Sequence, residues 1–236
     1  KGTTTTIYGG GNRGEIASNT IVSVSGGNIV DMYGGGNAAG VTGNTEVKIT
    51  GGTSTGSIFG GGNEGEITGN TNVSFENGNS ITIYGGGNKA RVLGSTDVSI
   101  KSGTINTVYG GGNQGAIESN TKVTVSGGNT KIVYGGGNAA GVTGNTEVFI
   151  VGGTIDGNVF GGGNQGTVTG NTNVIANNAT IHRSLYAGGN GASAIVYGNT
   201  NANVGGSTII GTESCTIYNT CGVFGGGNAA ATGSSS

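Results

Sequence analysis

Residues able to carry out chemistry are few and scattered in this sequence. The chain of 236 residues holds eleven Asp and Glu, nine Lys and Arg, one histidine and two cysteines. A polysaccharide-cleaving site needs several carboxylates, or carboxylates with basic residues, converging on one face. Here the acids are dispersed, and the adjacent His182 and Arg183 would point to opposite faces of a strand. We therefore expect a protein that is not an enzyme.

A Gly-Gly-Gly-Asn run recurs along the chain and invites comparison with calcium and phosphate sites. Calcium-binding nonapeptide repeats carry an acidic residue and have a much shorter period. Calcium also prefers several oxygen ligands, usually including carboxylates, and the run supplies none. The run lacks the Lys-Ser/Thr ending of a phosphate-binding loop. No cofactor and no metal site are predicted.

Composition excludes several classes of protein. Glycine accounts for 57 residues, proline and tryptophan are absent, and the net charge is −2. Collagen would need a strict period of three with much proline. The scattered basic residues argue against nucleic-acid binding, and no apolar run approaches the length of a membrane span. The chain opens in mid-repeat without a start methionine, which is expected of a segment of a longer protein.

The elements that position these residues follow from an internal repeat. An aromatic residue followed by a glycine-rich run and asparagine recurs every 25 or 26 residues, and the last interval is lengthened to 38. Tyrosine and phenylalanine exchange freely at this position, so the hydroxyl group is not essential there. The nine aromatic positions are Tyr8, Tyr33, Phe59, Tyr84, Tyr109, Tyr134, Phe160, Tyr186 and Phe224.

Each repeat reads as short strands separated by turns. Residues 45–49 alternate polar and apolar, which places Val47 and Ile49 on one face. A unit of this size cannot bury its apolar residues alone, whereas stacked units turn each column into a continuous apolar ladder. We predict an all-β parallel β-solenoid (β-helix) with about 25 residues per coil and eight to nine coils. Residues 1–236 form one domain, in which 205–236 make an irregular C-terminal coil and cap with an insertion.

The charged residues support stacking at one repeat per turn. In such a stack each residue faces its counterpart one repeat later, and opposite charges across parallel strands are stabilising. Five pairs of opposite charge are predicted: Glu64–Lys89, Glu66–Arg91, Glu76–Lys101, Asp97–Lys122 and Lys122–Glu147.

The aromatic column allows two interpretations. The residue before each ring should point into the core, so simple alternation would make the aromatic column an exposed stripe for ligands or self-association. The glycine run that follows could instead form a corner that turns the ring into packing. Both alternatives remain open from sequence.

Two polar columns accompany the aromatic residues. The first should form a structural asparagine ladder, because an amide can donate and accept along a stack. Its members are Asn12, Asn37, Asn63, Asn88, Asn113, Asn138, Asn164, Asn190 and Asn228. The second, a threonine column, resembles the arrays of ice-binding solenoids, although a turn-capping role for the hydroxyl groups is favoured. Its members are Thr20, Thr45, Thr71, Thr96, Thr121, Thr146, Thr172 and Thr200.

Both cysteines, Cys215 and Cys221, lie in the one insertion. Their spacing suits a disulfide that pins the irregular last coil, and such a bridge would imply an oxidising compartment.

The regular coils, the Gly/Asn/Thr-rich turns and the scarcity of charge resemble bacterial cell-surface β-solenoids of the adhesin or autotransporter-passenger type. The resemblance implies a non-catalytic structural or adhesive module, a surface stalk or adhesin rod located outside the cell. One alternative is a subunit of an extracellular filament joined end to end through open β-edges. Another is a glycan-binding or ice-binding solenoid. The expected partners are further copies of the chain, or host or surface glycans, with no nucleic acid.

Overall fold

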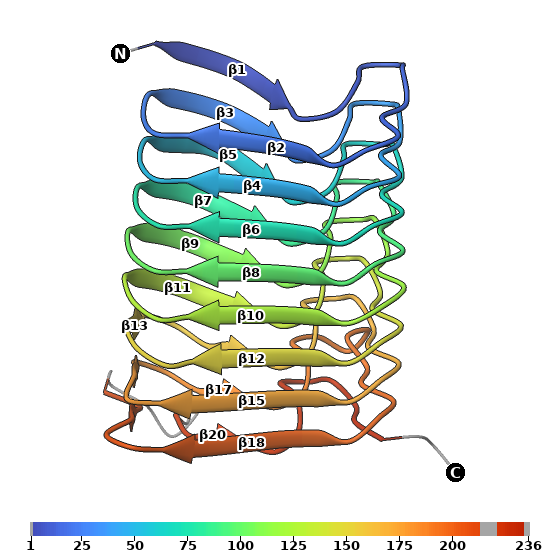
Figure 1. The fold of residues 1–236 in the computed structure, drawn as a ribbon. Helices are drawn as coiled ribbons and strands as arrows, with labels where there is room; N and C mark the ends of the chain where they lie inside the picture. Colours follow the sequence, from blue (N-terminus) through green and yellow to red (C-terminus); the bar gives the residue numbers. More distant parts are fainter. Residues whose placement is uncertain (1, 213–220, 234–236) are drawn as a thin grey trace.

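The computed structural model describes residues 2–212 and 221–233 and is a parallel β-solenoid (Figure 1). Successive coils are stacked along one axis, and strand residues pair with counterparts about 25 positions later, as Thr121 does with Thr146. This register confirms the predicted fold class and the period of one repeat per coil. In the described part of the chain, no helix is long and apolar enough to cross a membrane.

Two parallel sheets form the body of the solenoid. The first sheet contains β1 (Thr3–Tyr8), β3 (Asn28–Tyr33), β5 (Thr53–Phe59), β7 (Asn79–Tyr84), β9 (Thr104–Tyr109), β11 (Asn129–Tyr134), β13 (Thr154–Ile155), β14 (Val159–Phe160), β16 (Thr180–Ile181), β17 (Leu185–Tyr186), β19 (Ile209–Ile210) and β20 (Val223–Phe224). The second sheet contains β2 (Thr20–Val24), β4 (Thr45–Ile49), β6 (Thr71–Phe75), β8 (Thr96–Ile100), β10 (Thr121–Val125), β12 (Thr146–Ile150), β15 (Thr172–Asn177) and β18 (Thr200–Gly205).

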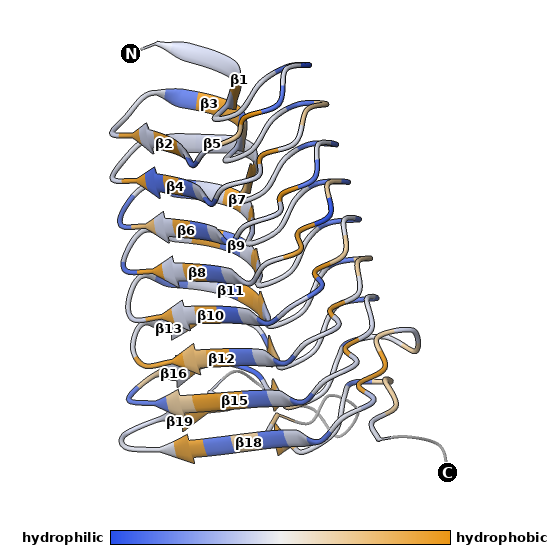
Figure 2. Ribbon diagram, turned by 45° about the vertical axis from the view of Figure 1, so that its right-hand side comes forward, coloured by the Kyte–Doolittle hydropathy of each residue, from blue (hydrophilic) through white to orange (hydrophobic). Residues whose placement is uncertain are grey.

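Between each aromatic residue and the next strand of the second sheet, the chain extends into an arm, such as residues 34–44. The arms stack on the right of Figure 1, and each contributes one apolar residue to a column of single parallel bridges, as Val41 and Ile67 do. Figure 2 shows orange, hydrophobic segments within arms that are otherwise mostly white or blue.

Three separate apolar columns stabilise the stack. The largest lies between the two sheets and includes Val98 and Val108, both fully buried. A second column fills the arms, and the stacked aromatic rings form the third. Each column is continuous along the axis because equivalent side chains lie above one another, as stacking of otherwise unstable units requires.

The glycine runs are required by close packing and not by a left-handed backbone conformation. Positive φ, which favours glycine, occurs in the turn after the second-sheet strand, for example at Gly27 and Gly103, and is absent from the runs after Tyr33 and Tyr109. In the runs, glycine is required by close packing. A Cβ atom on Gly110 would lie 2.2 Å from the carbonyl oxygen of Gly135 in the next coil. The runs are therefore places where the backbones of adjacent coils pack too closely for a side chain.

Candidate functional site

The aromatic column is a ladder of stacked rings. Neighbouring centroids are 4.7–5.0 Å apart and the ring planes differ by 3–11°. Tyr109 is only 7% exposed, whereas Tyr8, at the first coil, is 36% exposed. The rings point away from the main core, as alternation predicts, and are nevertheless buried because each ring covers its neighbours' faces. The inner rings therefore cannot offer an open face to a sugar.

Burial also changes the chemistry of the tyrosine hydroxyl groups. Loss of hydration raises the pKa of Tyr33 and of Tyr84 to about 12, with Asp31 contributing at Tyr33. The Tyr84 hydroxyl donates to Oδ1 of Asn113 at 3.4 Å, so the outer edge of the aromatic ladder meets the asparagine column. These tyrosines are neutral packing residues at physiological pH.

The predicted asparagine column forms a hydrogen-bonded ladder in the structure. Each Nδ2 donates to Oδ1 of the asparagine in the preceding coil over 2.8–3.0 Å, as Asn88 does to Asn63. All of these bonds have the same direction, so that along the column from Asn12 to Asn228 the later asparagine donates to the earlier one. Each amide is used in hydrogen bonds within the stack, which gives it a structural role.

The threonine column points into the molecule. Thr45 and Thr121 are each 1% exposed, and their hydroxyl groups donate to the carbonyl oxygens of Gly60 and Gly135 at 2.5–2.6 Å. The hydroxyl groups therefore bridge the start of one strand and the glycine run that follows the next. This column is not a surface array, so its hydroxyl groups cannot contact ice, and the resemblance to the threonine arrays of ice-binding solenoids is wrong for this column.

Three of the five predicted ion pairs form. Glu64–Lys89 measures 2.9 Å, Glu76–Lys101 3.0 Å and Asp97–Lys122 3.7 Å. Lys101 hydrogen-bonds Glu76, and this contact, with Lys48 at 3.5 Å, lowers the pKa of the carboxyl group.

Two predicted pairs are wrong. Arg91 turns away from Glu66 to Glu118, at 3.0 Å. Lys122 is the strand neighbour of Glu147, but its ammonium group lies near Asp97 and 5.9 Å from the centre of the Phe149 ring. A long side chain can reach more than one coil, so the backbone register does not by itself decide its partner.

The remaining titratable groups are spread over the molecule. Cys215 lies outside the described residues, so its bridge to Cys221 stays a prediction, although Cys221 is not a free thiol. His182 Nδ1 lies 3.5 Å from Asp156 Oδ1, between adjacent coils. Within residues 2–212 and 221–233, no group of three or more His, Cys, Asp or Glu is placed to hold a metal ion.

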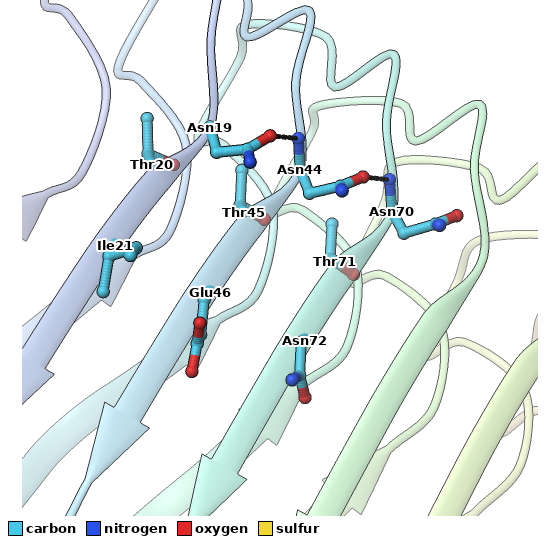
Figure 3. A pocket seen from close by; sticks show the side chains of 9 residues that line it. All are labelled: Asn19, Thr20, Ile21, Asn44, Thr45, Glu46, Asn70, Thr71 and Asn72. Atoms are coloured by element: carbon cyan, nitrogen blue, oxygen red, sulfur yellow. Dashed lines mark hydrogen bonds between the residues drawn. The ribbon is translucent and has the colours of Figure 1, made fainter.

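A surface groove was not anticipated from sequence. Two hollows of about 270 and 400 Å³ lie where the second-sheet strands begin, and both are lined by Asn70, Thr71 and Asn72. Because they share these residues, the two hollows lie side by side along the solenoid axis, and we call them together the trough; Figure 3 shows the residues that line the first.

Two rows of outward side chains border the trough. The amide row consists of the residues immediately before each buried threonine: Asn19, Asn44, Asn70, Ser95 and Asn120. The mixed row consists of the residues immediately after it: Ile21, Glu46, Asn72, Asp97, Lys122 and Glu147. The recurring Asn-Thr pair was the sequence signal that could have indicated the amide row.

Comparisons with known proteins identify no relative: no family model, no curated protein and no solved structure matches this chain.

Proposed function

We propose that this chain is a non-catalytic structural rod, serving as a stalk or adhesive segment outside the cell. The observation that carries the proposal is the continuity of the ladders. The aromatic rings and the asparagine amides each connect every coil to the next over nine repeats. Because each coil is bonded only to its neighbours, the solenoid is a regular, quasi-one-dimensional body, which suits a spacer or stalk.

The distribution of polar groups also supports a structural role. The two polar columns are engaged in hydrogen bonds within the stack: the threonine hydroxyl groups donate to glycine carbonyls across a coil, and the ladder amides bond each other between coils. Glu76 is held between Lys48 and Lys101. These contacts stabilise the stack, and they are the contacts expected of a structural element.

Shape and turnover together test the proposal. Eight coil intervals should give a rod about 40 Å tall, which electron microscopy and small-angle scattering of the purified chain can measure. Incubation with plant, bacterial and animal polysaccharides should release no new reducing or unsaturated ends. Depolymerisation of any of these glycans would overturn the non-catalytic role, and a compact globule would overturn the rod.

A further inference from the structure

The trough between the amide row and the mixed row has an ordered set of hydrogen-bond donors. Each asparagine of the amide row uses Oδ1 to accept the backbone N–H of the equivalent residue in the next coil, at 2.8 Å (Figure 3). The same bond recurs from Asn120 to Asn171. It fixes the orientation of each amide. In the described part of the chain, the Nδ2 atoms of this row have no protein acceptor, so they remain available as donors along the trough.

The opposite side of the trough supplies acceptors. Carboxylates occupy every second coil of the mixed row, at Glu46, Asp97 and Glu147. Asp97 pairs with Lys122, whereas Glu46 and Glu147 have no ion-pair partner among the described residues. A carboxylate accepts strong hydrogen bonds from neutral hydroxyl groups.

The two unpaired carboxylates occupy equivalent positions of the repeat, although the strand neighbour one coil earlier is Ile21 for Glu46 and Lys122 for Glu147. Residues 33–47 are identical to residues 134–148, so a unit of four coils is repeated within the chain. Glu46 and Glu147 are equivalent positions of that unit, each two residues after an asparagine of the amide row or its continuation. The same arrangement of donor and acceptor therefore occurs twice along one axis.

The chemistry of the trough selects among extended ligands. Strands β4, β6, β8, β10 and β12 beneath it are paired on both sides within the second sheet, so they offer a peptide no free edge, and the open edge of β2 lies only at the end of the trough. The excess of carboxylates in the mixed row disfavours an anionic polymer. A neutral chain rich in hydroxyl groups satisfies both rows, because each hydroxyl can accept from an amide and donate to a carboxylate.

We propose that the trough is a binding site for a neutral, linear polysaccharide lying along the solenoid axis. Successive coils lie 4.7–5.0 Å apart, the spacing of the stacked rings, and the carboxylates of the mixed row recur in every second coil. A regular polymer can therefore meet a carboxylate once in every two coils. The site uses surface groups beside the buried ladders and does not depend on the function of the rod.

Isothermal titration calorimetry tests the site with cellohexaose, xylohexaose and mannohexaose, and with hexagalacturonate as the anionic counterpart. At least one neutral hexasaccharide should bind, and hexagalacturonate should not. The double variant Glu46→Ile/Glu147→Ile removes both unpaired carboxylates, and isoleucine is already present in this row at Ile21. Its affinity for the bound hexasaccharide should fall by about tenfold or more, since hydrogen bonds to charged groups are the strong ones.

The matched control is Glu15→Ala/Glu66→Thr, which makes the same change in net charge on the arms. Each replacement is the residue found at the equivalent position of the second four-coil unit, Ala116 and Thr167. Its affinity should equal that of the unmodified chain. The proposed site would be overturned if none of the three neutral hexasaccharides bound, or if the Glu46→Ile/Glu147→Ile variant bound as tightly as the unmodified chain. Either result would leave the rod proposal standing. Cleavage of a bound hexasaccharide would instead overturn the non-catalytic rod.

Discussion

At the residue scale, two buried threonines differ in whether their hydroxyl groups have a hydrogen-bond partner, and this difference should change their contribution to the free energy of unfolding. Thr121 donates to the carbonyl oxygen of Gly135, at 2.6 Å. Thr130 is completely buried, and its hydroxyl has no hydrogen-bond partner in the described structure. Because an unsatisfied buried hydroxyl is costly, Thr130→Val should raise the free energy of unfolding by about 1 kcal/mol, whereas Thr121→Val should lower it by about 1–3 kcal/mol. Chemical denaturation of both variants measures the difference.

The neighbouring coils provide the control for this comparison. Ile105 and Ile155 occupy the positions above and below Thr130, so a branched apolar side chain already fits this column. If the two valine substitutions destabilised the chain equally, the Thr130 hydroxyl could not be an unsatisfied buried group.

The buried tyrosines of the aromatic ladder should make the chain less stable at alkaline pH. Burial raises the pKa of Tyr84 from 10.0 to about 12 in the folded chain. Below pH 10 the phenol is protonated in both states and its stabilisation is complete. As pH rises toward 12 the unfolded chain releases this proton first, so the free energy of unfolding falls. Denaturation measured from pH 8 to 12 should show this decline, and Tyr84→Phe should reduce it. An unchanged slope in Tyr84→Phe would contradict the prediction.

At the scale of the element, the glycine run predicts a sharp difference between two glycines. A Cβ on Gly110 would meet the Gly135 carbonyl at 2.2 Å and Val123 at 3.1 Å, whereas one on Gly14 would meet nothing within 4 Å. Gly110→Ala should therefore destabilise the chain by about 1–3 kcal/mol or more through overpacking. Gly14→Ala should leave the unfolding midpoint almost unchanged. Thermal unfolding followed by circular dichroism distinguishes them, and equal midpoints would refute the role of close packing.

At the scale of the whole molecule, assembly into filaments stays a prediction. The asparagine ladder is directional, since every Nδ2 donates to the preceding coil, so two copies could continue it only head to tail. Sedimentation velocity over a wide concentration range should then show growing species, and micrographs should show fibres with a repeat of about 40 Å. A strictly monomeric profile at high concentration would count against assembly.

Much of this architecture can be predicted from the repeat. In a parallel stack, residues one period apart must share a column, so the neighbours Val123 and Val148 and the Glu64–Lys89 pair follow from counting. The direction of the asparagine ladder does not follow, because an amide can bond either way. Neither does the partner of Arg91, because its flexible side chain can choose between coils.

By itself, the sequence determined the period, the parallel register and the columns, because equal spacing along a chain becomes vertical alignment in a stack. Tertiary structure alone decided what each column faces. The Thr45 hydroxyl is directed to a carbonyl across the coil, the Tyr109 ring is covered by its neighbours, and Gly110 has no room for a side chain. These outcomes depend on how the corner and arm of each coil bend, which is set by packing between segments that local alternation does not describe. The same bends leave Asn70 and Glu46 beside an open trough.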